Sequence, residues 1–107
     1  MNCKVNVLEF ARDDYRAIRK RVKLQFGAKV WAGVDADFKK MLNDIGQMPW
    51  SGSIPEEIKA IGLGDYRQRL VGQTRVIYQL KDGQVYVHLF VDTCRDFSSM
   101  LQQRLLG

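Results

Sequence analysis

One segment of seven residues, 85–91, constrains the fold of this chain more than any other. Its side chains form two rows in a strand: Val85, Val87, Leu89 and Val91 on one side, and Tyr86, His88 and Phe90 on the other. A strand exposed to water on one face usually alternates apolar with polar residues, whereas a strand in the middle of a sheet is apolar on both sides. The segment therefore predicts a central strand.

Two segments before this strand also have a period of two, which is the period of side chains along a strand. Residues 66–71 and residues 75–80 alternate in this way, and a short turn containing Gly72 separates them. The pair Asp82-Gly83 then precedes the central strand, and Asp-Gly is typical of a tight hairpin. We therefore expect three consecutive strands joined by short turns.

The first half of the chain has the helical period instead. Apolar residues recur every three or four positions over residues 11–26 and again over residues 30–45, with Gly27 between the two series and Gly46 after the second. This spacing predicts two amphipathic helices that form a hairpin and need a sheet to cover. A short strand is expected before them, at residues 3–8.

The remaining segments complete one domain. Residues 47–54 contain Pro49 and Gly52 and predict a loop, and a short helical turn is expected from Pro55. Phe97, Leu101 and Leu105 share one face of a final helix that Asp96 can cap. The prediction is a single α+β domain over residues 1–107, with an antiparallel sheet, an N-terminal α-hairpin on one face and a short C-terminal helix, in the order β-α-α-β-β-β-α.

The charge of the chain favours anionic partners. Lys and Arg total 17 against 12 Asp and Glu, which gives a formal net charge of +5, and nucleic acid or an acidic protein suits this balance. No window resembles a membrane span or a signal peptide, so we expect a cytoplasmic protein without a membrane partner. Cys3, Cys94 and the single histidine, His88, form no metal motif. We therefore expect no metal and no cofactor.

Four arginines are the candidate functional residues. Arg67 and Arg69 are two positions apart and share one face of their strand. Arg75 is expected to face the same way on the next strand, and Arg95 to reach the rim of the same surface. Guanidinium groups bind phosphate oxygens in a bidentate manner, so the set suits a polyanion. The alternative is a solvated face whose arginines pair with carboxylates such as Asp65, and the pattern alone does not decide.

The chain resembles the RelE/ParE superfamily of bacterial toxin–antitoxin toxins in four successive segments. These are residues 66–70, residues 74–80, residues 92–96 and the Leu-rich terminal helix. In the RelE branch, the resemblance implies a metal-independent, ribosome-dependent endoribonuclease that cuts mRNA and inhibits translation. By that resemblance Arg75 and Arg95 stabilise the phosphate in catalysis, while Arg67 and Arg69 bind the substrate or assist proton transfer. The implied partners are the ribosome, mRNA and a cognate antitoxin with an acidic segment that folds on binding.

One residue departs from the nuclease pattern. The RelE branch carries a Tyr or His where this chain has Leu101, and no Tyr or His follows His88. Three interpretations stay open: a weaker nuclease, a nuclease with another proton donor, or a toxin of the ParE branch, which poisons DNA gyrase. A member that has lost toxicity and only binds antitoxin is a further alternative. His88 is either a core residue or a neighbour of the arginines, and Trp31 and Trp50 fall outside the main apolar rows.

Overall fold

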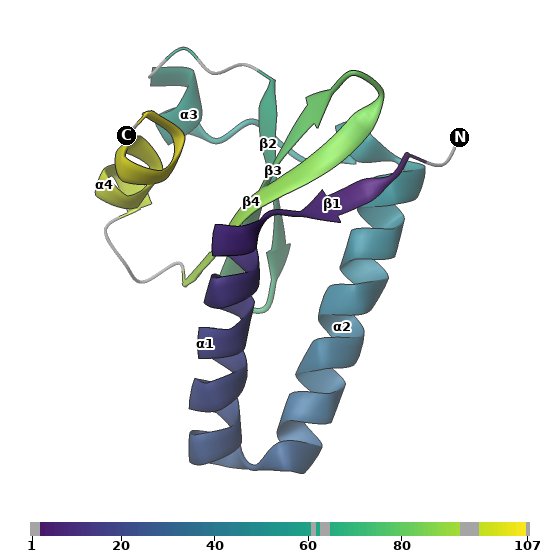
Figure 1. Cartoon of the computed structure of the whole chain (residues 1–107), viewed down its shortest axis with the longest axis vertical. Coiled ribbons are helices and arrows are strands. Elements are labelled where there is room, and N and C mark those ends of the chain that lie inside the picture. Colours follow the sequence, from purple (N-terminus) through teal and green to yellow (C-terminus); the bar gives the residue numbers. More distant parts are fainter. Residues whose placement is uncertain (1–2, 61, 63–64, 93–96, 107) are drawn as a thin grey trace.

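The computed structural model describes residues 3–60, 62, 65–92 and 97–106. The helices and strands follow the predicted order (Figure 1). They are β1 (Val5–Val7), α1 (Glu9–Phe26), α2 (Ala28–Gln47), the 3-10 turn η1 (Pro49–Ser51), α3 (Glu56–Ala60), β2 (Tyr66–Val71), β3 (Thr74–Lys81), β4 (Gln84–Asp92), α4 (Phe97–Leu101) and the π-helical turn η2 (Gln102–Leu106). The predicted α+β fold is therefore confirmed. Among the helices of the described ranges, none is both long and apolar enough to cross a membrane.

The four strands form one sheet in the order β1-β4-β3-β2, so β4 is central as predicted. The neighbours β2 and β3, and β3 and β4, are antiparallel, whereas β1 pairs with β4 in parallel. The predicted antiparallel sheet is therefore found in β2, β3 and β4, whereas the pair of β1 and β4 departs from it. Because the α1–α2 hairpin returns the chain to its starting end, β2 runs in the direction of β1. The hairpin from β2 to β3 reverses the chain and the hairpin from β3 to β4 reverses it again, so β4 runs in the same direction as β1.

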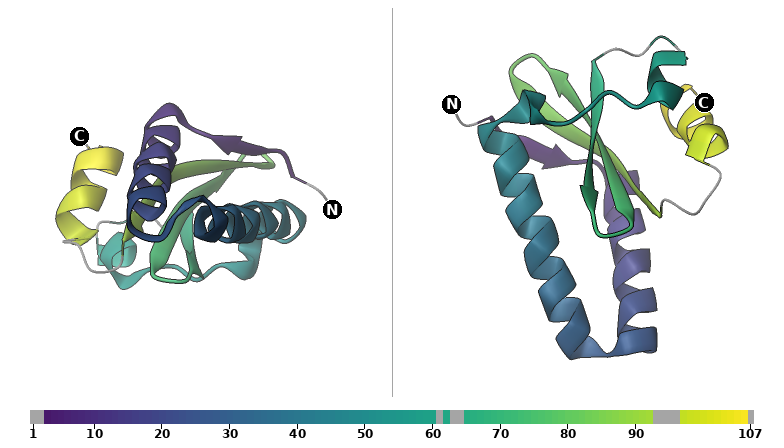
Figure 2. Two further views of the ribbon diagram at one scale, coloured as in Figure 1. Left: turned by 90° about the horizontal axis from the view of Figure 1, so that it is seen from below. Right: turned by 180° about the vertical axis from the view of Figure 1, so that it is seen from behind.

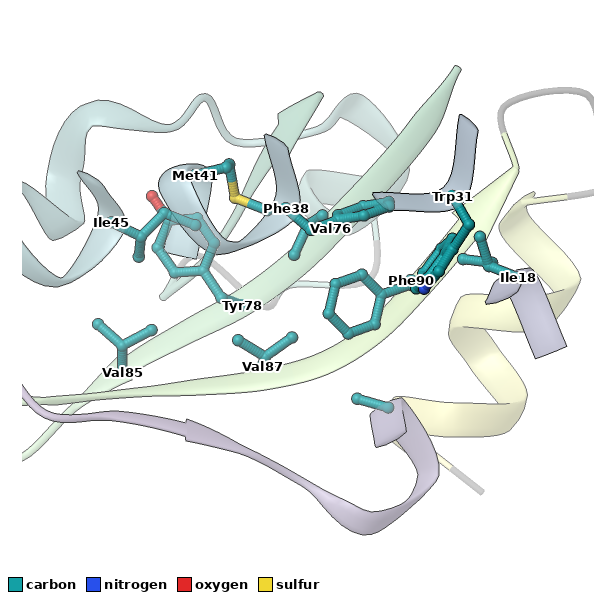
Figure 3. Packing of buried hydrophobic residues seen from close by; sticks show 11 residues of the cluster. Ile18, Trp31, Phe38, Met41, Ile45, Val76, Tyr78, Val85, Val87 and Phe90 are labelled. Atoms are coloured by element: carbon teal, nitrogen blue, oxygen red, sulfur yellow. The ribbon is translucent and has the colours of Figure 1, made fainter. Parts of the chain in front are cut away.

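The hairpin of α1 and α2 covers one face of the sheet and forms the first core (Figure 3). Phe38 and Phe90 meet edge to face there at 5.6 Å between ring centroids. Trp31 is buried in the same core, so the prediction that it lies outside the apolar rows is wrong. Phe26 and Val30 are exposed instead, because the turn between the helices extends beyond the sheet (Figure 1).

The short helices α3 and α4 cover the other face and form the second core. They lie side by side, with the sheet between them and α2 (Figure 2). Leu101 of α4 is 1% exposed and packs with Ile58 and Leu89, as expected of an apolar core residue. Arg104 of η2 forms an ion pair with Asp14 of α1, and this pair ties the C-terminal segment to the hairpin.

A β-bulge at His88 changes which residues of β4 share a face. Tyr78 of β3 pairs with Val87, but Ile77 pairs with Leu89, so His88 is an extra residue without a partner in the register. The prediction that the odd-numbered residues 85–91 share one face is therefore wrong beyond the bulge. Val87 and Phe90 enter the first core and Leu89 enters the second, because one inserted residue reverses the alternation.

Candidate functional site

Arg67 and Arg69 lie on the outer strand β2, on the face of the sheet that α1 and α2 cover. In the register between β2 and β3, Arg67 pairs with Tyr78 and Arg69 pairs with Val76, and both β3 side chains are buried in the first core. Directly paired residues share a face. At this edge of the sheet the two guanidinium groups therefore meet the segment that follows α2, residues 48–53, which we name the Trp50 loop.

Both guanidinium groups donate hydrogen bonds to the Trp50 loop. Nη1 of Arg67 donates to the carbonyl oxygens of Trp50 at 3.3 Å and Gly52 at 2.9 Å. Nη1 of Arg69 donates to Oγ of Ser51 at 2.9 Å. The two arginines thus hold a loop in place, a role that their spacing in the sequence did not indicate.

Tyr78 holds the same loop from inside the first core. Its hydroxyl donates to the carbonyl oxygen of Pro49 at 2.6 Å and accepts the backbone N–H of Gly52 at 3.1 Å. Burial raises the pKa of Tyr78, so the hydroxyl stays protonated at neutral pH and remains a donor. A Cβ on Gly52 would lie 2.5 Å from that hydroxyl, so only glycine fits at this position. The Trp50 loop is therefore built around the Tyr78 hydroxyl.

Arg75 lies on the opposite face of the sheet. It pairs with Leu70 in the register, not with Arg67 or Arg69. Its Nη1 forms an ion pair with Oε2 of Glu57 in α3 at 3.2 Å. The prediction that Arg75 shares a face with Arg67 and Arg69 is therefore wrong. The length of the turn could have shown this. A turn of two residues, Gly72 and Gln73, pairs Val71 with Thr74, so the next pair is Leu70 with Arg75, on the other face from Arg69.

The other elements of the predicted ribonuclease site do not complete it within the described residues. Arg95 lies outside those residues, so its predicted place at the rim of the arginine surface has no structural account. Leu101, at the position of the nuclease branch's Tyr or His, is buried in the second core.

His88 lies on the face of the second core, away from Arg67 and Arg69. Its Nε2 lies 3.0 Å from the amide oxygen of Gln79, whose Nε2 donates to Asp65 at 2.9 Å. Its ring packs 5.0 Å from the ring of Tyr66. Burial lowers the pKa of His88, so the imidazole is neutral at pH 7. The half-buried His88 is thus closer to the core interpretation than to a neighbour of the arginines. No group of three potential metal ligands occurs within the described ranges.

A groove between α1 and α2 carries positive charge at its rim. Its lining includes the apolar side chains of Val7, Leu42 and Phe90 and, along α1, the cations Arg12, Arg16 and Arg19. At its α2 side, Asp35 accepts a hydrogen bond from Tyr15 and pairs with Lys39 at 2.7 Å. These two contacts, led by that of Lys39, lower the pKa of Asp35. The groove therefore combines an apolar lining with an excess of cations.

Comparison with known proteins identifies the family. The sequence model of a family described as "ParE toxin of type II toxin-antitoxin system, parDE" matches residues 5–96. A solved structure described as a chromosomal ParDE TA system from P. aeruginosa superposes with a TM-score of 0.70 at 11% sequence identity, over 84% of this chain and 95% of that chain. At this identity the likeness shows a shared fold. Curated proteins include no match to the sequence. Because the family match spans most of the chain, the protein belongs to the ParE toxin family of type II toxin–antitoxin systems.

Proposed function

We propose that the target of this toxin is DNA gyrase, which it poisons through protein contacts, and that mRNA is not its substrate. The observation that carries the proposal is the separation of the arginines. Arg75 is on one face of the sheet with Glu57, whereas Arg67 and Arg69 are on the other. Cleavage of a phosphodiester needs cations and proton-transfer groups that converge on one phosphate. A sheet between these cations opposes such convergence.

The state of each side chain supports the same conclusion. Arg67 and Arg69 already donate to oxygen atoms of the Trp50 loop. Leu101 has no proton to give and is buried. His88, the one histidine, lies on the face opposite Arg67 and Arg69 and is bonded to Gln79. The match to the ParE family adds weight, because the resemblance to the ParE branch implies a gyrase poison without a nuclease site.

The second part of the proposal concerns the antitoxin. The partner of a type II toxin is its cognate antitoxin, and we place the antitoxin's acidic segment in the groove between α1 and α2. Its cationic rim, with Arg12, Arg16 and Arg19, suits carboxylates, while Val7 and Leu42 suit apolar side chains. A disordered acidic segment that folds on binding meets both requirements.

The test compares the two activities with the same preparation of toxin, released from its antitoxin. With purified gyrase, ATP and supercoiled plasmid, we expect the toxin to accumulate double-strand breaks. Arg75→Ala, with an unchanged fold by circular dichroism, is expected to act within about twofold of wild type, because a poison that works through protein contacts needs no phosphate-stabilising arginine and Arg75 is paired with Glu57. With programmed ribosomes, we expect mRNA to remain intact.

The opposite result identifies the ribonuclease. Cleavage of ribosome-bound mRNA that Arg75→Ala abolishes, with no DNA breaks, would overturn the gyrase proposal and restore the role predicted for Arg75. If neither activity appears and induced expression leaves growth unimpeded, the chain is an antitoxin-binding member without toxicity.

A further inference from the structure

We infer that the Trp50 loop, residues 48–53, is the surface by which this toxin contacts gyrase, with Trp50 inserted into an apolar pocket that carboxylates border. The inference rests on the proposed target and adds the contact surface. Trp50 is 58% exposed and Met48, two residues before it, is 56% exposed. Tryptophan, methionine and arginine are the residue types enriched at the centre of protein interfaces.

Exposure alone does not indicate a binding site, because single exposed aromatic residues are common. The second observation is how firmly the loop is held. Arg67 bonds two of its carbonyl oxygens, Arg69 bonds the Ser51 hydroxyl, and Tyr78 bonds the loop at two points. Ser53 adds a backbone pair with Gln68 of β2, at 3.2 and 2.7 Å. An exposed tryptophan on an ordered loop loses little conformational entropy on binding.

The charge beside the loop indicates the chemistry of the partner. Arg67 and Arg69 each bond the loop through Nη1, and a guanidinium group has five N–H donors. No carboxylate within the described part of the chain pairs with either group. The remaining donors therefore suit carboxylates of a partner protein.

A protein fits this surface better than a nucleic acid does. Nucleic-acid surfaces carry several cations that neutralise successive phosphates. Here, among the described residues, two cations, Arg67 and Arg69, bond the loop, which is too few to neutralise a run of successive phosphates. The exposed apolar side chains of Met48 and Trp50 supply the larger part of the contact.

The experiment measures gyrase-dependent DNA breaks over a range of toxin concentrations. We expect Trp50→Ala to raise the half-maximal concentration by about 30-fold or more, which is typical of removing an interface tryptophan. Trp50→Phe, which keeps an aromatic ring, should retain most of the wild-type activity in producing breaks. Phe26→Ala is the matched control, because Phe26 is also an exposed aromatic residue, 64% exposed, at the far turn of the α-hairpin. It should stay within about twofold of wild type.

Each outcome separates the two proposals. If wild type makes breaks and Trp50→Ala, with an unchanged melting temperature, makes them equally well, the inference is wrong and the gyrase target stands. If wild type makes no breaks, the proposed target itself is wrong. If Trp50→Ala loses affinity for a single-stranded RNA oligonucleotide but not for gyrase, the loop is a nucleic-acid surface and the inference is overturned.

Discussion

Replacing Gly52 with alanine tests whether the Trp50 loop is as tightly built as its hydrogen bonds indicate. The added Cβ would lie 2.5 Å from the Tyr78 hydroxyl and 2.6 Å from the backbone oxygen of Gln68. Contacts this short cannot persist, so either the loop or the buried ring of Tyr78 must move. Both shifts break the bonds that join the hydroxyl to Pro49 and Gly52.

The cost follows from these two effects. Forcing an extra methyl group into a packed site costs about 1–3 kcal/mol. Each buried hydrogen bond contributes about 0.5–1.5 kcal/mol, and Gly52→Ala threatens two of them. We therefore expect the free energy of unfolding to fall by about 2 kcal/mol or more. For a domain of this size, 1 kcal/mol lowers the melting temperature by about 4 °C, so the expected loss is at least about 8 °C.

Thermal unfolding followed by circular dichroism measures this loss, and Gly33→Ala is the matched control. Gly33 lies within α2, and nothing lies within 4 Å of a Cβ placed on it. Alanine is the better helix former by about 0.5–1 kcal/mol, so this control should melt slightly above wild type. A melting temperature of Gly52→Ala within about 2 °C of wild type would refute the reasoning, because the loop would then yield without cost.

Three further predictions concern stability. Burial lowers the pKa of His88, so below about pH 6.5 the unfolded chain binds a proton that the folded chain excludes. The melting temperature of wild type should therefore fall between pH 7.5 and about 5.5, and that of His88→Gln should not. The contact with Lys39 lowers the pKa of Asp35, so the ionised carboxylate stabilises the folded chain above about pH 4, and this stabilisation is lost on acidification. In Asp35→Asn, the melting temperature should therefore fall less between about pH 5 and 3 than it does in wild type. A double-mutant cycle on Asp14 and Arg104, with side chains 15% and 22% exposed, should give a coupling of about 1–3 kcal/mol in urea unfolding, and a value below about 0.5 kcal/mol would contradict the anchoring role.

The helices and strands were predictable because each follows from short-range periodicity. The hairpin turn at Gly27 and the central strand over residues 85–91 needed no tertiary information. The inward row of α2 was predicted correctly except at its start, which was taken as Val30. Counted from Trp31, the row continues through Val34 and Phe38 with helical spacing, and these are the residues that pack in or against the first core. Which side chain faces the core near the end of a helix depends on where the sheet ends. The periodicity of the sequence does not give that position.

The β-bulge at His88 was beyond prediction for a different reason. Every residue around it is apolar or aromatic, so no polar position marks where the alternation reverses. The parallel edge of the sheet was missed because Val5 and Val7 indicate a strand but not its direction. Both features depend on long-range pairing, and local sequence patterns are insensitive to it.

The arginines show how one turn decides a functional interpretation. A two-residue turn pairs Val71 with Thr74, and the alternation of strands then fixes Leu70 opposite Arg75 and Arg69 opposite Val76. A turn longer by one residue would have put all three arginines on one face. The sheet instead divides them, and the division assigns different tasks: Arg75 joins β3 to α3 through Glu57, while Arg67 and Arg69 hold the loop that exposes Trp50. The same residue types that suggested a phosphate site in the sequence thus hold the loop that we propose as a protein contact.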